Sequence, residues 1–197
     1  MMKKVFILIS LLLTTLCITG CNQKNEENLA QNMKKIELTG NLVTYKAFYH
    51  NVIEHEKEKG SGVSHWLEKD RKLFAEYTGT IKLGINLSEV KVDVKGNQID
   101  VSIPKAIIIG KPNVDKDDFK EENFIESKEG INKNTITGED VSKAFDKAQA
   151  NMEENASGDT ELLSIAQKRA KIVLEEKIKQ LSGMPEDKYV INWKYEQ

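Results

Sequence analysis

The sequence predicts an α+β fold: an antiparallel or mixed sheet with two C-terminal helices and a final strand, preceded by a lipoprotein signal peptide. Residues 81–103 alternate between apolar and polar positions, which is typical of strands with one buried face. Residues 138–182 repeat their apolar residues at helical spacing, and residues 189–195 return to strand alternation. Because the helices follow the strands as a block, the order favours α+β over repeated βαβ units.

Three strands are predicted within Tyr77–Ile109, separated by short breaks. The predicted strands are residues 81–87, 90–94 and 99–103. The sequence Lys95-Gly96-Asn97-Gln98 supplies a turn between the last two. We expect Ile85 and Val101 to lie on the buried face, where truncation to alanine would leave a cavity.

The segments around these strands are less regular. Residues 36–54 carry bulk on both faces of an extended pattern, which predicts a central strand. Residues 56–62 are a charged loop, and residues 63–77 fit either a helix or a strand. Residues 115–138 are expected to form a loop with short strands.

Two helices are predicted near the C-terminus, each with a start signal. Thr137 caps the first, which is expected to end at residues 155–158. Asp159 caps the second, and Gly183 followed by Pro185 ends it. Glu175 and Lys179 form a favourable pair four residues apart. The predicted buried faces contain Val141, Ala144, Phe145, Ala148 and Met152 in the first helix, and Leu162, Leu163, Ala166, Ala170, Val173, Leu174 and Leu181 in the second.

The N-terminus has the pattern of a targeting segment. Lys3 and Lys4 precede the apolar run Val5–Leu16, which is too short to span a membrane comfortably. The run ends in Ile18-Thr19-Gly20-Cys21, which resembles the bacterial lipobox.

That resemblance implies cleavage between Gly20 and Cys21, and a diacylglycerol on the Cys21 sulfur with further acyl chains such as palmitate. The alternative is an ordinary signal peptide with an incidental cysteine. We expect residues 1–20 to be the signal peptide, the polar residues 21–37 to be a flexible tether, and residues 38–197 to be a single α+β domain.

Charge and cysteine content exclude several kinds of partner. The chain has 29 basic and 31 acidic residues, and its formal charge becomes −4 once Met1–Gly20 is removed. This balance gives no basic surface for nucleic acid, so no nucleic-acid partner is expected. Both cysteines, Cys17 and Cys21, are N-terminal, which leaves none for a disulfide in the domain.

No motif for catalysis or a cofactor is present. The glycines lack the spacing of a phosphate-binding loop, and no Gly-x-Ser-x-Gly elbow occurs. His50, His55 and His65 are the three histidines, and the odd spacing of the first two places them on opposite faces of a strand. The acidic clusters lack the spacing of a calcium loop. We therefore expect no catalytic residues, no cofactor and no metal.

Aromatic residues offer weak candidates for a ligand pocket or an interface. Tyr45, Tyr49, Trp66 and Trp193 are the ones that we single out. Such residues more often lie in a core than in a ligand site, so a small-molecule pocket is the less favoured interpretation.

Three blocks resemble the bacterial family known as domain of unknown function 4230. They are Leu42-Val43-Thr44-Tyr45, the glycine-containing stretch Tyr77–Ser88, and Ile99–Ala106. The resemblance covers residues 38–184 and implies an extracytoplasmic domain, because members often look like lipoproteins or single-span proteins. Members usually carry Asp where this chain has Asn86. The resemblance implies no catalytic residues.

The expected function is a lipid-anchored, extracytoplasmic binding or scaffold module of the bacterial cell membrane. The lipid on Cys21 would hold it to the membrane, and its partner would be another envelope protein or its own copy. A solute-binding lipoprotein with an aromatic-lined pocket is the first alternative, and an envelope hydrolase is the second. We expect that the protein is not an enzyme.

Overall fold

The computed structural model describes Leu29 and residues 31–33, 38–127, 133–183 and 185–196. The predicted signal peptide, the cleavage site and Cys21 lie outside these residues, and they stay predictions. The described part of the expected tether, Leu29 and residues 31–33, is helical, with Leu29 and Met33 buried.

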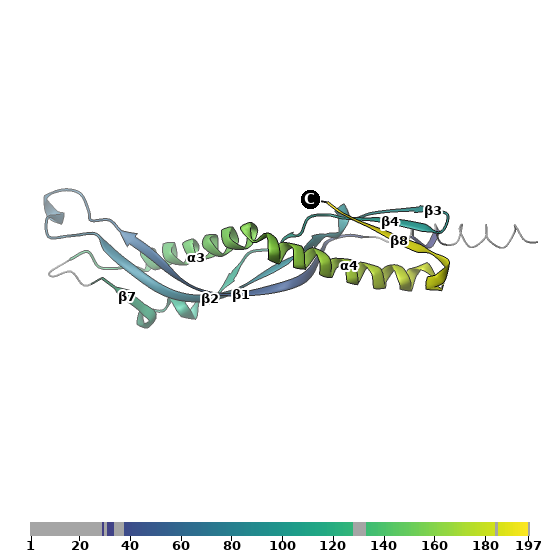
Figure 1. Cartoon of the computed structure of the whole chain (residues 1–197). Helices are drawn as coiled ribbons and strands as arrows, with labels where there is room; N and C mark the ends of the chain where they lie inside the picture. The colour runs from purple at the N-terminus through teal and green to yellow at the C-terminus, as the bar shows by residue number, and fades with distance from the viewer. Residues whose placement is uncertain (1–28, 30, 34–37, 128–132, 184, 197) are drawn as a thin grey trace, which may run out of the picture. The chain divides into compact units, whose positions relative to one another are not determined.

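The described chain divides into two compact units. The first unit comprises Leu42–Ile85 and Ala106–Gln167, and the second comprises residues 86–105 and 168–196 with the described residues up to Asn41. Each contains a sheet and part of helix α4 (Thr160–Ser182). The α+β class is confirmed, with antiparallel and mixed sheets, two long C-terminal helices and a final strand (Figure 1).

The first unit is built on two long strands, β1 (Asn41–Lys57) and β2 (Arg71–Asn86), which are neighbours in a five-stranded sheet. Three short strands pair antiparallel with β2, and they are β5 (Ile107–Ile108), β6 (Asn113–Val114) and β7 (Phe124–Glu126). The segment 63–77 fitted either a helix or a strand in the sequence. In the structure, residues 63–65 form a 3-10 turn and strand β2 begins at Arg71.

Strand β1 corrects one expectation. Among the described residues it pairs only with β2, so it is an edge strand and not the predicted central strand. The bulk on its second face is exposed: Phe48 and Val52 are open to solvent, while Ala47 and Ile53 are buried. Large side chains on both faces of a strand do not show how many neighbouring strands it pairs with, so this pattern cannot distinguish a central strand from an edge strand.

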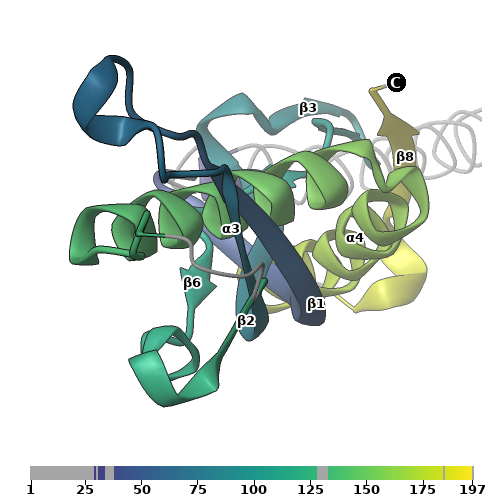
Figure 2. The ribbon, with the colours of Figure 1, turned by 90° about the vertical axis from the view of Figure 1, so that its left-hand side faces the viewer.

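Helix α3 (Gly138–Gly158) covers one face of the β1–β2 sheet (Figure 2). Tyr77 donates a hydrogen bond from its hydroxyl to Asn151 Oδ1 at 3.0 Å, which joins the buried face of β2 to this helix. The helix ends at Gly158, the last residue of the stretch 155–158 where we expected it to end. The residues buried between sheet and helix include Leu73, Ala75, Tyr77, Ile81, Leu83, Ile85, Ala144, Ala148, Met152 and Ala156.

The second unit contains a three-stranded sheet, so the residues 77–109 contribute to two sheets. Strand β3 (Lys91–Lys95) pairs antiparallel with β4 (Gln98–Ile103), and the turn between them contains Gly96 at φ 61°. The final strand β8 (Val190–Tyr195) pairs parallel to β4, with Trp193 opposite Val101.

Start and stop signals of α4 behave as predicted. Asp159 Oδ1 accepts hydrogen bonds from the N–H groups of Glu161 and Leu162, and Gly183 follows the helix at φ 64°. The Glu175–Lys179 pair is present at 3.3 Å. Val173 is partly exposed rather than buried, and Ile178 is buried in the second unit in addition to the predicted residues.

Candidate functional site

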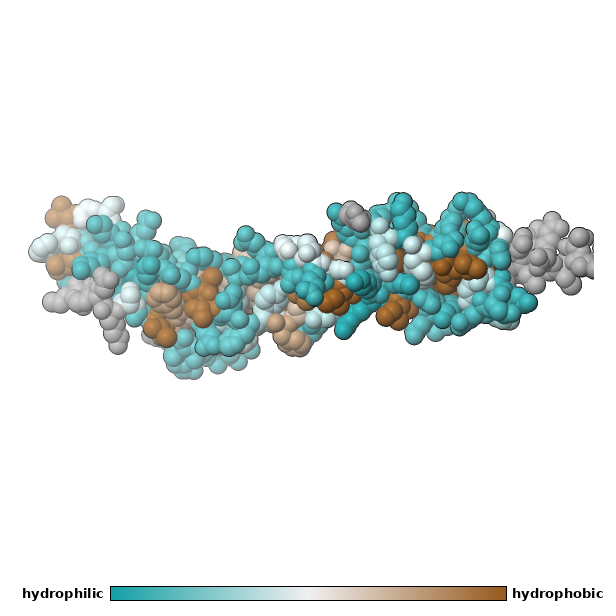
Figure 3. Space-filling view, in the orientation of Figure 1, coloured by the Kyte–Doolittle hydropathy of each residue, from teal (hydrophilic) through white to brown (hydrophobic). Residues whose placement is uncertain are grey.

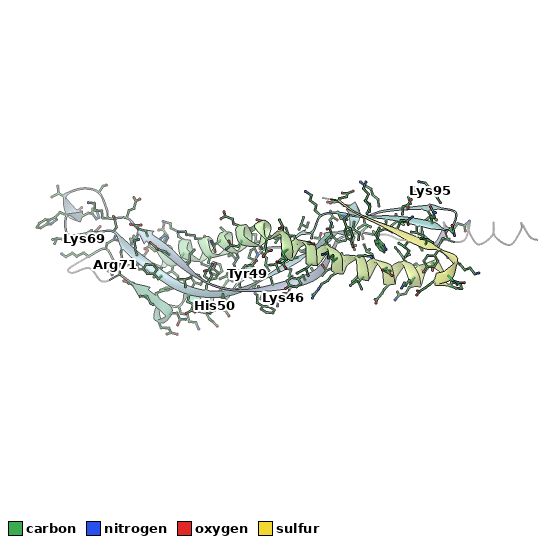
Figure 4. The ribbon with its side chains drawn as sticks, in the orientation of Figure 1. Lys46, Tyr49, His50, Lys69, Arg71 and Lys95 are labelled. Atoms are coloured by element: carbon green, nitrogen blue, oxygen red, sulfur yellow. The ribbon has the colours of Figure 1, made fainter. Side chains whose placement is uncertain are left out.

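The candidate site is the face of the first unit's sheet that lies opposite α3, which we call the outward face. On β1 it carries Lys46, Phe48, His50, Val52 and Glu54, all exposed. Alternate residues of a strand point to opposite faces, so the odd-numbered neighbours point toward α3. Figure 4 shows this alternation, with Tyr49 on the α3 side and Lys46 and His50 on the other.

Apolar side chains lie in a row across this face. Phe48, Val52 and Ile125 are 77%, 58% and 71% exposed, and Phe74 is half-buried. Phe74 on β2 is the register partner of Ile125 on β7, so their side chains share a face. We call Phe48, Val52, Phe74 and Ile125 the apolar row, and Figure 3 shows hydrophobic surface among hydrophilic residues in the region of β2 and β7.

Two ion pairs between β1 and β2 flank the middle of the apolar row. His50 contacts Glu76, and Lys72 Nζ lies 2.6 Å from Glu54 Oε1. The Glu54 contact raises the pKa of Lys72, first through the hydrogen bond and then through charge. Because all four side chains are well exposed, these pairs fix the register of the two strands more than they add stability.

A shallow hollow of about 670 Å³ adjoins the row. Its walls combine polar and apolar surface, and Phe48 is exposed at its border. Asp118 shapes one wall by accepting hydrogen bonds from both the N–H and the hydroxyl of Thr78, at 2.7 and 2.8 Å. The lining residues are Phe48–His50, Thr78–Thr80 and Asn113–Asp117.

Tyr49 lies on the α3 side of β1, away from the apolar row, and Tyr45, four residues earlier on the strand, shares this face by alternation. Burial raises the pKa of Tyr49, and the nearby charge of Asp159 and then Tyr45 raise it further. Tyr49 also lines the hollow. Of the four aromatic candidates, the structure therefore brings these two together.

Trp66 lies in the connection between β1 and β2, residues 58–70, which we call the tip loop. It is 78% exposed, and Val63 beside it is more exposed still. The loop is braced: Asn134 Nδ2 contacts the carbonyl oxygens of Lys57, Glu58 and Lys69 at 3.1–3.3 Å. The tip loop is held by hydrogen bonds and carries an exposed tryptophan, so it is a second candidate contact surface.

Trp193 belongs to the second unit. It lies on β8, and Lys171 Nζ is 5.5 Å from the centre of its ring, a distance suited to a cation–π contact. It borders a hollow of about 340 Å³ together with Val101 and polar residues of β3 and β4.

The three histidines each contact one carboxylate. His50 contacts Glu76, His55 Nε2 lies 3.7 Å from Asp140 Oδ1, and His65 Nδ1 lies 2.8 Å from Glu68 Oε2. Unlike the other two, His55 is largely buried. Within the described ranges, no group of three or more His, Cys, Asp or Glu side chains is placed to hold a metal ion.

Asn86, at the position where the resembling family usually has Asp, stabilises a local turn. Its Oδ1 accepts from the Ser88 N–H at 3.0 Å, and its Nδ2 donates to Glu89 Oε1 at 2.9 Å. An aspartate would keep the first bond and lose the second. The hydrogen bond to Glu89 therefore gives the Asn86 amide a structural role in this turn.

These features define an α+β protein whose first unit presents an open, partly apolar sheet face. The chain belongs to the family described as protein of unknown function (DUF4230), whose model matches residues 34–187. This match confirms the resemblance seen in the blocks around β1, β2 and β4. No curated protein and no solved structure matches the chain. In the part of the chain that the structure describes, no helix is both long and apolar enough to cross a membrane.

Proposed function

We propose that this protein is a lipid-anchored module on the extracytoplasmic face of the bacterial cell membrane, which binds a protein partner through the outward face. The observation that carries the binding role is the apolar row. Four apolar side chains of three neighbouring strands share one sheet face, and exposed apolar side chains that gather on one face commonly mark contact surfaces. The anchor rests on the lipobox resemblance at Ile18–Cys21.

The chemistry of the row suits a protein contact. Phe48, Val52 and Ile125 offer exposed apolar surface, and the His50–Glu76 and Glu54–Lys72 pairs offer polar groups beside it. Protein interfaces commonly have this arrangement, with most of the energy from a few buried aromatic or aliphatic anchors.

The solute-binding alternative has less support. The hollow that Tyr49 and Phe48 border is wide open to solvent, whereas small-molecule sites usually enclose most of the ligand's surface. The hydrolase alternative has the least support, because the side chains of His50 and Glu76 are about two-thirds exposed. A general base of tuned pKa is usually held in a more sheltered site.

Photo-crosslinking in the native membrane tests the proposal. A benzoylphenylalanine in place of Val52 should give discrete crosslinked bands, whereas one in place of Ile172 should not. Ile172 is a matched control because it is 59% exposed but lies on α4, outside the row. Phe48→Ser should abolish the Val52 crosslinks. Equal crosslinking from both positions would contradict a binding role for the outward face.

A further inference from the structure

We infer that the partner of the outward face is a second copy of this chain, joined edge to edge through antiparallel pairing of the two β1 strands. This inference rests on the proposed function and names its partner. Among the described residues β1 pairs only with β2, so its second edge borders no strand. At 17 residues β1 is long, and long exposed edges tend to pair with another chain.

Three contacts of the described residues lie toward the two ends of the β1 segment 44–54. The Val52 N–H is bonded to Asn51 Oδ1 at 2.8 Å, and the Glu54 carbonyl accepts from Lys147 Nζ at 2.8 Å. Thr44 at the other end donates from its hydroxyl to the Ala166 carbonyl at 2.7 Å. Residues 45–51 lie between these contacts and include His50, and pairing through Val52 and Glu54 would exchange their bonds to Asn51 and Lys147 for bonds to the partner strand.

The outward side chains of one β1 strand are complementary to those of a second β1 strand that runs in the opposite direction. They run Lys46, Phe48, His50, Val52, Glu54. A two-fold axis at His50 in an antiparallel pair places Lys46 opposite the second copy's Glu54, and Phe48 opposite its Val52. Each contact occurs twice, as a two-fold interface requires.

These contacts would satisfy groups that are exposed in one copy. Phe48 and Val52 would bury each other across the strands, and directly opposed aromatic and β-branched residues stabilise antiparallel pairs. Glu54 already contacts Lys72 of its own chain and would gain Lys46 of the second copy. The apolar rows of the two copies would then adjoin each other across one sheet.

Other pairings lose this complementarity. A parallel pair in register would place Lys46 beside the second copy's Lys46 and Glu54 beside its Glu54, and like charges directly opposed are destabilising. An unrelated extended peptide would give no reason for the reversed order of charge and bulk around His50. The charge pattern therefore favours the antiparallel second copy.

Cysteine crosslinking of the full-length protein in its own membrane tests the register. In the antiparallel pair the two copies of residue 50 have Cα atoms about 4.5 or 5.5 Å apart. That separation lies inside the disulfide range of about 4.4–6.8 Å. His50→Cys should therefore give a disulfide-linked dimer on mild oxidation. Lys46→Cys alone should not, because its two copies would lie roughly 25 Å apart along the strands.

Co-expression of two cysteine variants in the same cells provides a second test of the register. Lys46→Cys co-expressed with Glu54→Cys should give a mixed dimer, although neither gives a dimer alone. The unmodified chain measures any background from Cys21, and Ile172→Cys is the matched control for random collision.

Charge reversal provides an independent arm. In the His50→Cys background, Lys46→Glu should lower the dimer fraction roughly tenfold, because two repulsive contacts replace two attractive ones. Adding Glu54→Lys should restore it. Lys82→Glu, an exposed change on β2 away from the edge, should leave it unchanged.

The outcomes separate this inference from the proposed function. If His50→Cys dimerises no more than Ile172→Cys while the Val52 crosslinks persist to another protein, the second copy is the wrong partner and the outward face still binds. If the Val52 crosslinks are also absent, both proposals fail. A dimer whose Cys21 carries no acyl chain would uphold the pairing and overturn the anchor.

Discussion

Asp140 is the residue on which the start of α3 depends. Its Oδ2 accepts hydrogen bonds from the N–H and the hydroxyl of Thr137, at 2.8 and 2.6 Å, and from Lys57 Nζ at 2.9 Å. Burial alone would raise the pKa of Asp140, but the hydrogen bonds from Lys57 and Thr137 outweigh burial and hold this pKa well below its usual 3.8. The carboxylate thus joins the helix cap to the end of β1.

The low pKa of Asp140 predicts an acid-sensitive contribution to stability. Because the folded pKa is the lower one, the contribution is complete well above pH 3.8, begins to decline as pH falls below that value, and is lost as pH falls through the folded pKa. Asp140→Asn should lower the free energy of unfolding by about 2 kcal/mol at pH 7, from the lost cap and charged hydrogen bonds. Urea unfolding of both proteins should show this difference shrinking below about pH 4.

Asp146→Asn is the control, since Asp146 is exposed on the same helix. It should change the free energy of unfolding by less than about 0.5 kcal/mol. A constant difference between wild type and Asp140→Asn from pH 7 to pH 2 would show that the charge of Asp140 is not what stabilises the cap.

Gly84 explains part of the glycine-containing block in β2. A Cβ at this position would lie 1.9 Å from the carbonyl oxygen of Leu42 on β1. Gly79 is similarly crowded, by Met152 Sδ at 2.7 Å, but a flexible side chain yields more easily than backbone. The block therefore has glycine at Gly84 because the backbone of β1 approaches it closely.

Gly84→Ala should accordingly destabilise the protein by about 1–3 kcal/mol, the range for an overpacked site that must shift backbone. Gly138→Ala is the matched control, because nothing lies within 4 Å of its added carbon and alanine favours a helix. Thermal unfolding compares the two. An unchanged melting temperature for Gly84→Ala would mean that β1 moves aside at no cost.

At the scale of elements, the tip loop shows how an exposed segment is held in one conformation. Asp70 accepts from the Lys59 N–H at 2.8 Å, and Glu68 accepts from the Gly60 N–H at 3.0 Å. The Gly60 bond lowers the pKa of Glu68, and the His65 contact lowers it further. With Asn134 bridging both ends of the loop, the exposed Trp66 lies on a braced support.

Asn134→Ala should release this brace. The three carbonyl groups that Asn134 serves would lose a donor, and the loop would open at lower free energy than the strands. Hydrogen exchange should therefore rise within residues 58–70 and stay unchanged in β4. A uniform rise across the chain would indicate global destabilisation and would contradict a local role.

At the scale of the whole molecule, the lipid anchor decides where the binding face operates. If the lipobox resemblance holds, mature protein begins at Cys21 and its intact mass includes acyl chains. Cys21→Ser should leave an unlipidated precursor or a released form in membrane fractionation. Mature protein that starts at Cys21 without acyl mass would contradict the anchor, but it would not contradict a binding role for the outward face.

Local pattern was sufficient for the helices and most strands. Thr137 and Asp159 cap α3 and α4 because capping depends on residues within one turn. Ile85 and Val101 are buried as their alternation predicts, since period two belongs to the strand itself. The family could also be read from short blocks, and the match over residues 34–187 confirms it.

Long-range pairing decided the rest. The sequence around Phe48 and Val52 predicted a central strand, but whether bulk is covered depends on which strands and helices lie against it. Likewise, residues 77–109 predicted strands, yet only β8, about ninety residues beyond β4, shows that β3 and β4 belong to a separate sheet. The apolar row could not be predicted from the sequence, because β1, β2 and β7 each contribute only one or two of its residues. Sequence determines the faces of each element, and tertiary structure determines which of those faces remains open.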